Sequence, residues 1–391
     1  MAGGPRPPVS AGRVDALRGR MIAQLIESDG PGGAERLLAE LAGDLVRGGC
    51  ACIAFLPARG EGWLGRELER AGVTVEHFRL ERPLSPRCAR ELAAAFARHR
   101  VSLAHSHEFS MGVYGAWAAR RAGIPHVLTM HGSRYYAGRL RRRVALRLAV
   151  AASGACVAVS GPLADHLRRD LLLGHGRVTV IPNGVPRVAG TRGTLRTELG
   201  LGPRDRLILA VGNLYPVKGH LYLIEALAAL RRRHPEAHVA IAGRGDEGRS
   251  LAALAAARGL GDRVHLLGLR DDVPGLLAAA DVFAMPSLSE GLPMALLEAM
   301  FAALPIVASD VGEIRTALAG GAAGVLVPPG DVPALAGALA RVLGDPGAAR
   351  ALGARAAERG VAEYDLARTV ERYAGLYAQL LRGRRNGTGP A

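Results

Sequence analysis

The residues Asp281-Val-Phe-Ala-Met-Pro-Ser-Leu-Ser-Glu-Gly-Leu-Pro-Met-Ala-Leu-Leu-Glu-Ala-Met300 predict a strand, a loop and the start of a helix. The apolar run at its beginning ends at a proline, as a buried strand does, and the polar loop after it contains a glycine. Pro293 takes the place of a first helical residue, and Met294 and Leu297 follow at helical spacing. Free N–H groups and the positive dipole end at such a helix start favour an anion.

Two carboxylates bracket this predicted anion site. Glu290 lies in the loop, and Glu298 lies on the second turn of the helix. A diphosphate at the helix start would leave both side chains available for hydroxyl groups on either side. The alternative is an ordinary strand-to-helix turn with two solvated glutamates, and this stretch alone does not decide between the two.

Short β-rich runs alternate with amphipathic helical runs along the whole chain. This alternation predicts an α/β fold with two doubly wound, Rossmann-like domains, each with a parallel sheet covered on both faces. Ligands in such folds bind beyond the carboxyl ends of the strands, so the cleft between the domains is the expected site. The predicted strands are 20–26, 51–55, 74–77, 101–105, 126–129, 155–159 and 178–181, then 207–212, 238–243, 264–268, 282–286, 306–309 and 325–327.

The turn-rich segment Pro182-Asn-Gly-Val-Pro186 separates the two predicted domains. We place the first domain at residues 20–187 and the second at 188–369. Residues 1–19 are rich in Gly, Pro and Arg and predict a disordered lead-in. Residues 370–391 form a separate C-terminal helix and tail.

The amino-acid composition indicates the class of fold and the cellular compartment of the protein. Apolar residues make up 49% of the 391-residue chain and aromatic residues only 4%, which favours helix-on-sheet layers over an aromatic-rich sandwich. Four scattered cysteines without a C-x-x-C pair predict a reduced, cytoplasmic protein. Neither a secretory signal nor an apolar stretch long enough to span a bilayer is expected from the sequence.

Positive charge is concentrated in the first half of the chain. The net charge is +15, of which residues 1–190 carry +12 and residues 191–391 carry +3. This predicts an anionic partner for the first domain. Nucleic acid is disfavoured because basic residues do not alternate with aromatic ones. The basic segment Arg139–Arg147 is either a solvated helix face or a docking site for an anionic membrane surface.

Lys218 is the only lysine in the chain. It lies in a predicted strand-to-helix loop, before Gly219 and a helix that begins near His220. A compact ammonium group beside a helix start suits a phosphate, so we favour this role over that of a solvated surface lysine.

Other strand ends carry weaker signals. Gly32 and Gly33 belong to a glycine-rich loop that is not a G-x-G-x-x-G fingerprint, so a dinucleotide is disfavoured and a plain tight turn stays open. His131 precedes a glycine and is the histidine that we favour for the site. The alternative is a histidine that only makes hydrogen bonds within the protein. His105 and His107 lack the further ligands of a metal site, so no metal is expected. Arg244 and Arg270 follow two second-domain strands and could line a nucleotide-base pocket.

Together these motifs resemble glycosyltransferase family 4, the retaining enzymes of the GT-B fold that use nucleotide-sugar donors. The resemblance runs from about residue 20 to 380. It implies that Lys218 binds the donor diphosphate, that Glu290 holds hydroxyls of the transferred sugar, and that Glu298 holds the ribose. The remaining implied contacts are the Gly291 and Leu292 backbone at the phosphates, Gly32 and Gly33 approaching the diphosphate, His131 beside the donor sugar, and Arg270 against the base.

The resemblance also carries one departure and one expectation about the fold. Asn213 stands where many members have an arginine that shares the phosphates with the lysine. Either Lys218 and the helix dipoles then carry more of the charge stabilisation, or another arginine, such as Arg244, substitutes for it. The GT-B fold commonly returns its last helix to the first domain, which here implies Val370–Leu381.

The resulting hypothesis is a retaining glycosyltransferase, independent of metal and of any cofactor. We expect a UDP-sugar donor and a saccharide, lipid-linked or small-molecule acceptor, in polysaccharide, glycolipid or other glycoconjugate biosynthesis. The protein would be cytoplasmic and peripheral to the cell membrane. Two alternatives stay open, a nucleotide-sugar epimerase of the same fold and a non-catalytic basic binding protein.

Overall fold

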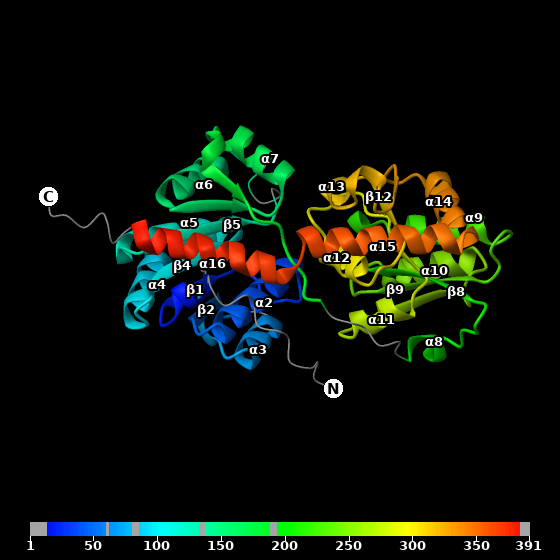
Figure 1. The fold of residues 1–391 in the computed structure, drawn as a ribbon, viewed down its shortest axis with the longest axis horizontal. Helices are drawn as coiled ribbons and strands as arrows, with labels where there is room; N and C mark the ends of the chain where they lie inside the picture. The colour runs from blue at the N-terminus through cyan, green and yellow to red at the C-terminus, as the bar shows by residue number, and fades with distance from the viewer. Residues whose placement is uncertain are drawn as a thin grey trace. The chain divides into compact units, whose positions relative to one another are not determined.

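The computed structural model describes residues 14–59, 62–79, 86–132, 136, 138–187 and 194–383. The chain forms two compact units (Figure 1). Unit 1 consists of Met1–Gly184 and Leu366–Ala391, and unit 2 consists of Val185–Asp365.

Unit 1 is built on a seven-stranded parallel sheet with the strand order β3-β2-β1-β4-β5-β6-β7. The crossovers leave the sheet on both faces, which is why the central strands are buried almost throughout. The strands are β1 (Met21–Leu25), β2 (Ala51–Pro57), β3 (Thr74–Phe78), β4 (Leu103–His107), β5 (His126–Met130), β6 (Ala155–Ala158) and β7 (Val178–Val180).

Helices cover both faces of this sheet because alternate side chains of each strand point to opposite sides. Ile22 and Leu103 pack against α2, α3 and α16, whereas Ala23 and Ala104 pack in the layer of α4 and α5. The helices are α2 (Gly33–Arg47), α3 (Trp63–Arg70), α4 (Pro86–Arg98), α5 (Glu108–Ala122), α6 (Leu140–Ala152), α7 (Gly161–Leu171) and α16 (Leu366–Gly383), with 3-10 turns η1 (Asp15–Leu17) and η2 (His175–Arg177).

Unit 2 repeats the scheme with six parallel strands in the order β10-β9-β8-β11-β12-β13. One face of the sheet packs on α9, α10 and α14, and the other packs on α11, α12, α13 and α15. The strands are β8 (Arg206–Val211), β9 (Ala237–Ala242), β10 (Val264–Gly268), β11 (Val282–Met285), β12 (Ile306–Ser309) and β13 (Val325–Val327).

The helical elements of unit 2 fill the crossovers between these strands. They are α8 (Leu195–Glu198), η3 (Pro216–Lys218), α9 (His220–Leu230), α10 (Gly248–Ala257), α11 (Val273–Ala279), α12 (Met294–Phe301), α13 (Ile314–Ala317), η4 (Ala319–Gly321), α14 (Val332–Gly344) and α15 (Pro346–Glu363). The predicted fold class, two doubly wound parallel-sheet α/β domains, is confirmed.

Several predicted boundaries differ from the structure, most of them by one or two residues. Residues 14–19 are ordered rather than part of a disordered lead-in, because Val14 and Leu17 are buried in the unit 1 core, while residues 1–13 lie outside the described part. Strand β4 continues to His107 instead of ending two residues earlier. Pro293 caps helix α12 with extended backbone angles and is not its first residue.

Candidate functional site

The lysine loop of unit 2 is held against the loop that contains Glu290. Gly219 opens α9 with a φ of 65°, and a Cβ there would lie 2.2 Å from the Pro286 carbonyl oxygen. The Leu288 amide donates to the Val217 carbonyl at 2.8 Å. Only glycine permits this close approach of two backbones, so the two loops form one unit although about 70 residues separate them in the sequence.

Lys218 and Glu290 meet in this unit as an ion pair. The Lys218 ammonium donates to Glu290 Oε1 at 2.8 Å and to Oε2 at 2.9 Å, and Ser287 Oγ donates to Oε1 at 2.7 Å. The Glu290 side chain is 7% exposed and that of Lys218 is 26% exposed. Such a half-buried charge pair is screened less than a surface pair. An incoming phosphate would therefore compete with Glu290 for the ammonium.

The start of α12 lies directly after Glu290. Leu292 is buried while Gly291 is exposed, and no side chain caps the helix at Pro293 within the described residues. The Gly291 carbonyl accepts from the Glu313 amide at 3.2 Å. This segment thus keeps backbone N–H groups at a helix start, which is the arrangement that binds anions.

Gly312 supports the same segment from the loop after β12. It has a φ of 53°, and a Cβ there would lie 2.0 Å from the Glu290 carbonyl oxygen. Glu298 lies half-buried on α12 and is engaged with other groups of the protein.

Asn213 and Arg244 lie on adjacent loops of unit 2. The Leu214 amide donates to the Arg244 carbonyl at 2.8 Å, and a Cβ on Gly243 would lie 1.9 Å from the Gly212 carbonyl. The exposed Arg244 therefore lies on a loop that packs against the Asn213 loop. A residue that replaces the missing arginine has to lie on such a neighbouring loop.

Arg270 and His220 are both held by neighbours within unit 2. Arg270 donates to Asp272 at 2.7 Å and to Glu198 at 3.1 Å, so a base contact would have to share its guanidinium. His220 Nε2 donates to the Asn213 carbonyl at 3.2 Å. Burial lowers the pKa of His220 to about 4, so the neutral ring anchors the lysine loop. In the sequence, the only signal for this role of His220 is its place after Gly219.

The glycine loop of unit 1 packs around one of its own carboxylates. Gly32 caps α2, and a Cβ there would lie 2.2 Å from Glu35 Oε2. Ser28 donates to the same carboxylate. Asp29 accepts from the Gly62 amide at 2.8 Å and tethers the loop to α3. The close approach at Gly32 is therefore explained by Glu35, and a ligand contact of Gly32 and Gly33 stays a prediction.

A chain of hydrogen bonds sets the tautomer of His131. His107 Nε2 donates to Gln24 Oε1 at 3.1 Å, so its Nδ1 is left to accept from His131 Nε2 at 3.1 Å. The Nδ1 atom of His131 is then an unprotonated acceptor, and it is buried without a partner. Burial lowers the pKa of His131 to about 4. The ring is neutral and can accept a hydrogen bond from a hydroxyl group.

His105 does not take part in such a site, contrary to its predicted place at a strand end. It is fully buried, and its two ring nitrogens bond to Thr129 Oγ1 at 2.7 Å and to Tyr377 OH at 2.6 Å. Thr129 in turn bonds to Tyr373 OH at 3.1 Å. These bonds tie α16 to the sheet. Among the described residues, no group of three or more potential ligands could hold a metal ion.

Glu108 is a further candidate, which no motif in the sequence predicted. It follows β4 with a φ of 66°, which is strained for a side chain of this kind, and its Oε2 atom is buried without a partner. Burial raises the pKa of Glu108 to about 8, with Glu27 adding to the effect and the His131 backbone amide opposing it. The carboxyl group is therefore largely protonated at neutral pH. The signal in the sequence was an acid directly after the His-Ser-His strand end.

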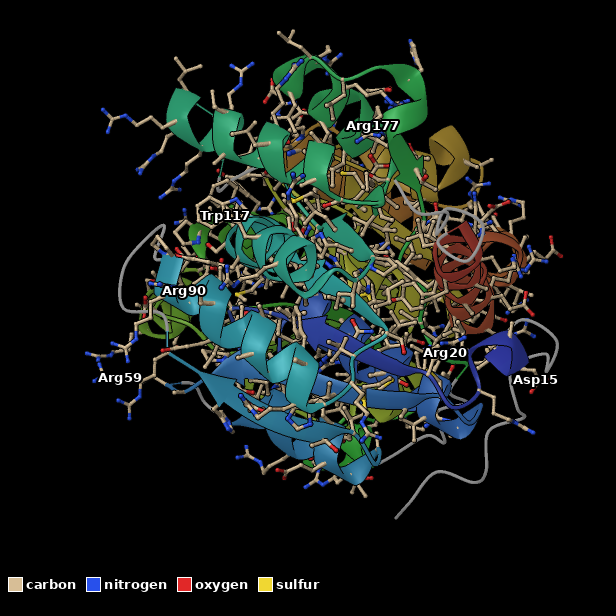
Figure 2. The ribbon with its side chains drawn as sticks, turned by 90° about the vertical axis from the view of Figure 1, so that its left-hand side faces the viewer. Asp15, Arg20, Arg59, Arg90, Trp117 and Arg177 are labelled. Carbon is tan, nitrogen blue, oxygen red and sulfur yellow. The ribbon has the colours of Figure 1, made fainter. Side chains whose placement is uncertain are left out.

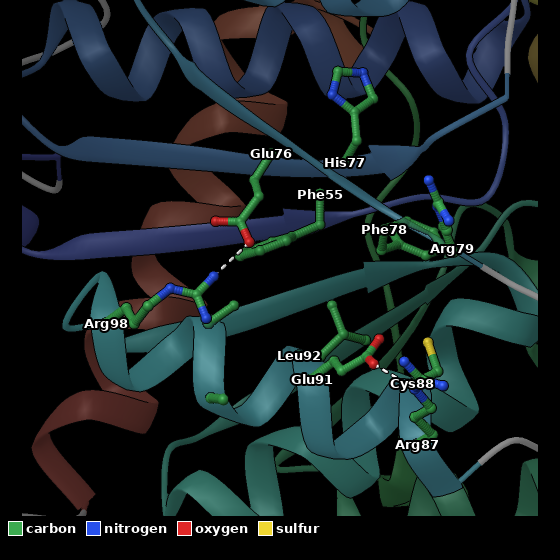
Figure 3. A pocket seen from close by; sticks show the side chains of 12 residues that line it. Phe55, Glu76, His77, Phe78, Arg79, Arg87, Cys88, Glu91, Leu92 and Arg98 are labelled. Atoms are coloured by element: carbon green, nitrogen blue, oxygen red, sulfur yellow. Dashed lines mark hydrogen bonds and ion pairs between the residues drawn. The ribbon is translucent and has the colours of Figure 1, made fainter.

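A separate pocket of about 430 Å³ lies between β3 and α4 in unit 1 (Figure 3). Phe55, Phe78 and Leu92 are among its apolar lining residues. Its two carboxylates are already paired, Glu76 with Arg98 at 2.7 Å and Glu91 with Arg87 at 2.7 Å. The sheet order places it at the β3 edge, away from the β1, β4 and β5 positions of the histidine chain.

The comparisons with known proteins assign the family. Residues 31–187 match Glycosyltransferase Family 4, and residues 191–359 match Glycosyl transferases group 1. An alpha-D-kanosaminyltransferase of Streptomyces kanamyceticus is 32% identical over 297 residues, which span 71% of this chain and 77% of that protein. The chain belongs to glycosyltransferase family 4. The predicted resemblance is confirmed.

Further relatives of this glycosyltransferase agree with its fold. A UDP-Gal:alpha-D-GlcNAc-diphosphoundecaprenol alpha-1,3-galactosyltransferase of Escherichia coli is 30% identical over 265 residues, covering 63% of this chain and 68% of that enzyme. The structure of HepE from Anabaena, solved with UDP, matches with a TM-score of 0.80 at 23% identity, covering 92% of this chain and 100% of that chain. The fold is thus the GT-B fold of these transferases. Within the described residues, no helix combines the length and the apolar character needed to cross a membrane.

Proposed function

We propose that this glycosyltransferase transfers a sugar from a UDP-sugar to an acceptor hydroxyl, with retention of the anomeric configuration. The observation that carries the proposal is the Lys218–Glu290 ion pair beside the open start of α12. A UDP donor is supported by the UDP complex of HepE and by the name of the galactosyltransferase relative.

The residues of unit 2 have distinct roles in this proposal. Lys218 moves from Glu290 to the donor diphosphate and, with the backbone at Gly291 and Leu292, stabilises the charge of the leaving group. Glu290 is then free to accept hydrogen bonds from sugar hydroxyls, and Glu298 holds the ribose. Arg244 supplies the second positive charge in place of Asn213. The reaction needs no metal and no cofactor beyond the donor.

In this proposal, two side chains of unit 1 form hydrogen bonds with the acceptor hydroxyl. His131 Nδ1 is an acceptor by its tautomer, and the protonated Glu108 carboxyl can donate. Together they offer one acceptor and one donor, which suits a hydroxyl group that must be held in place. Retaining transfer then takes place on one face of the sugar without a covalent enzyme intermediate.

The class of acceptor is inferred from the names of the relatives and from the charge of the first half of the chain. The relatives are named for a kanosaminyl transfer, a diphosphoundecaprenol-linked sugar and D-inositol 3-phosphate. The last two acceptors are anionic, which fits the +12 charge of residues 1–190. We favour an anionic saccharide or lipid-linked acceptor in glycoconjugate or polysaccharide synthesis, on the cytoplasmic side of the membrane.

A thermal-shift screen tests the donor site. UDP-, GDP- and ADP-sugars are compared on the wild type, on Lys218→Ala and on Arg231→Ala, which removes an exposed charge elsewhere in unit 2. At about 100 times Kd, the correct donor should raise Tm by roughly 5–10 °C in the wild type and in Arg231→Ala. Lys218→Ala should lose the shift, and an unchanged shift in that variant contradicts the site.

Glu290→Gln separates phosphate binding from transfer. This isosteric change removes the charge that competes for Lys218, so UDP alone should bind about fivefold more tightly. Glycoside formation should fall at least about 100-fold because the carboxylate no longer holds the sugar. Titration of UDP and a product assay measure the two effects. Weaker UDP binding with intact transfer contradicts the assigned role, and an epimerised donor without glycoside would favour an epimerase.

A further inference from the structure

Helix α6 carries large apolar side chains on its outward face. Leu140, Val144 and Leu148 are 74%, 50% and 63% exposed, and their spacing of four residues aligns them along one side of the helix. The opposite side of α6 is buried through Leu146 and Val150. An ordinary surface helix is polar on its outer face, so this stripe indicates a partner.

Two neighbouring helices extend the apolar stripe. Leu172 at the end of α7 is 77% exposed, and it adjoins α6 because Arg147 donates to its carbonyl at 3.0 Å. Trp117 on α5 is 46% exposed, and α5 packs on α6 around Ala149. Figure 2 shows Trp117 on the same side of unit 1 as the side chains that extend outward from α6. These five residues, Leu140, Val144, Leu148, Leu172 and Trp117, are called the α6 face.

The surroundings of the α6 face are strongly basic. Residues 86–172, which contain α4 to α7, have fourteen arginines against four acidic residues. Arg143 and Arg147 donate hydrogen bonds to carbonyl groups at the end of α7 and so hold α6 against α7. Arg139 and Arg141 are exposed at the start of α6, where they can meet an anion.

We propose that the α6 face docks on a bilayer that contains anionic phospholipids, with its leucines at the acyl boundary and Arg139 and Arg141 at the phosphates. Exposed leucine, valine and tryptophan beside arginine match the interfacial zone of a membrane. A second copy of the chain is disfavoured because the same positive charge would face itself. Nucleic acid is disfavoured because aliphatic side chains offer no stacking platform.

The two tryptophans of the chain make the proposal directly testable. Trp63 lies on α3, on the opposite face of the sheet, where Arg36 stacks over its ring at 5.9 Å. Trp63→Phe and Trp117→Phe each leave a single reporter in the full-length protein. Both are mixed with vesicles of phosphatidylcholine and phosphatidylglycerol that carry brominated acyl chains. Quenching is expected for Trp117 and not for Trp63, and phosphatidylcholine alone should give little binding.

Charge-matched variants identify the contacts. Leu140→Gln with Leu148→Gln should lower the affinity for anionic vesicles about tenfold or more, and Arg139→Gln with Arg141→Gln should lower it about fivefold per arginine. Arg231→Gln with Arg232→Gln removes the same charge from an exposed site in unit 2 and should leave binding unchanged. Because the replaced side chains are exposed, Tm should stay within about 1–2 °C of the wild type.

Three outcomes overturn the proposal. These are equal quenching of the two tryptophans, oligonucleotide binding without vesicle binding, and a dimer in sedimentation experiments that Leu148→Gln dissociates. Vesicle binding is measured without donor or acceptor, so its failure leaves the donor thermal shift as an independent test of the proposed transfer.

Discussion

At the scale of single residues, unit 2 depends on glycines where two backbones meet. Gly219 and Gly312 bring the lysine loop and the β12 loop against the segment 286–290. Both have positive φ values, and both would place a Cβ about 2 Å from a backbone carbonyl oxygen. A backbone carbonyl cannot turn aside as a flexible side chain can, so these contacts determine where the Glu290 carboxylate lies.

Gly312→Ala should therefore impair both stability and donor binding. The unfavourable φ of 53° alone costs about 1 kcal/mol, and displacement of the Glu290 backbone should add about 2 kcal/mol and weaken donor binding about tenfold. Gly320→Ala is the matched control, because its φ is 66° but no atom lies within 4 Å of the added Cβ. Denaturant unfolding and donor titration measure the effects. Equal losses in the two variants would show that the contact with Glu290 is unimportant.

At the scale of elements, α16 is joined to the unit 1 sheet by buried polar contacts as well as by apolar packing. Tyr373 and Tyr377 are fully buried in the same core as α2 and β1. Their hydroxyl groups reach Thr129 and His105 on neighbouring strands. His107 lies one ring away from His105, with ring centroids 4.2 Å apart, so this network adjoins the chain that orients His131.

Tyr377→Phe tests this link between α16 and the sheet. Loss of the hydroxyl leaves a buried nitrogen of His105 without its 2.6 Å partner, so the free energy of unfolding should fall by about 1–3 kcal/mol. Tyr215→Phe alters an exposed hydroxyl of unit 2 and should change stability by less than about 0.5 kcal/mol. Thermal and denaturant unfolding provide the measurement. A neutral effect of Tyr377→Phe would mean that the bond between Tyr377 and His105 does not help to hold α16.

At the scale of the whole molecule, ionisable groups distinguish the two units. Unit 1 buries four neutral histidines, His105, His107, His126 and His131, and burial lowers the pKa of each. In unit 2, burial likewise lowers the pKa of His220, to about 4, and the pKa of His238 and His265. Unit 1 also contains Glu108, whose pKa is raised to about 8.

These shifts predict opposite pH effects within unit 1. Below pH 6.5 the histidines bind protons in the unfolded state but not in the folded state, so the free energy of unfolding decreases as the pH is lowered. His126, with a pKa of about 3, accounts for a loss of about 2 kcal/mol at pH 5. Glu108 acts in the other direction, because the folded state holds its proton up to about pH 8 and is stabilised as pH falls from 8 towards 4.5. Stability of unit 1 should therefore be greatest near neutral pH.

Hydrogen exchange at pH 5 and pH 7, corrected for intrinsic rates, tests this expectation. Protection should decrease at pH 5 more for β4 and β5 of unit 1 than for β8 and β11 of unit 2. Glu108→Gln should abolish the loss of stability between pH 6.5 and 8 and leave the loss below pH 6.5 in place. Equal protection losses in both units would contradict the assigned burial of the histidines.

The sequence by itself determined the order of strands and helices and the class of fold. Strand positions depend on local patterns of apolar and turn residues, and these patterns placed even the short β11 and β12 within one or two residues. The lone Lys218 and the Glu290 loop could be singled out as candidates because the loop, the glycine and the helix start are each local features.

Only the tertiary structure decided which of these groups meet. Lys218 and Glu290 lie 72 positions apart, and their ion pair depends on the parallel neighbours β8 and β11. His105 and His131 both looked like strand-end histidines, yet packing of α16 occupies the first, while the second keeps a buried, unpartnered nitrogen. The raised pKa of Glu108 arises from its burial, whereas the α6 face consists of apolar side chains that no other segment covers. Both depend on how distant segments pack, which no local pattern encodes.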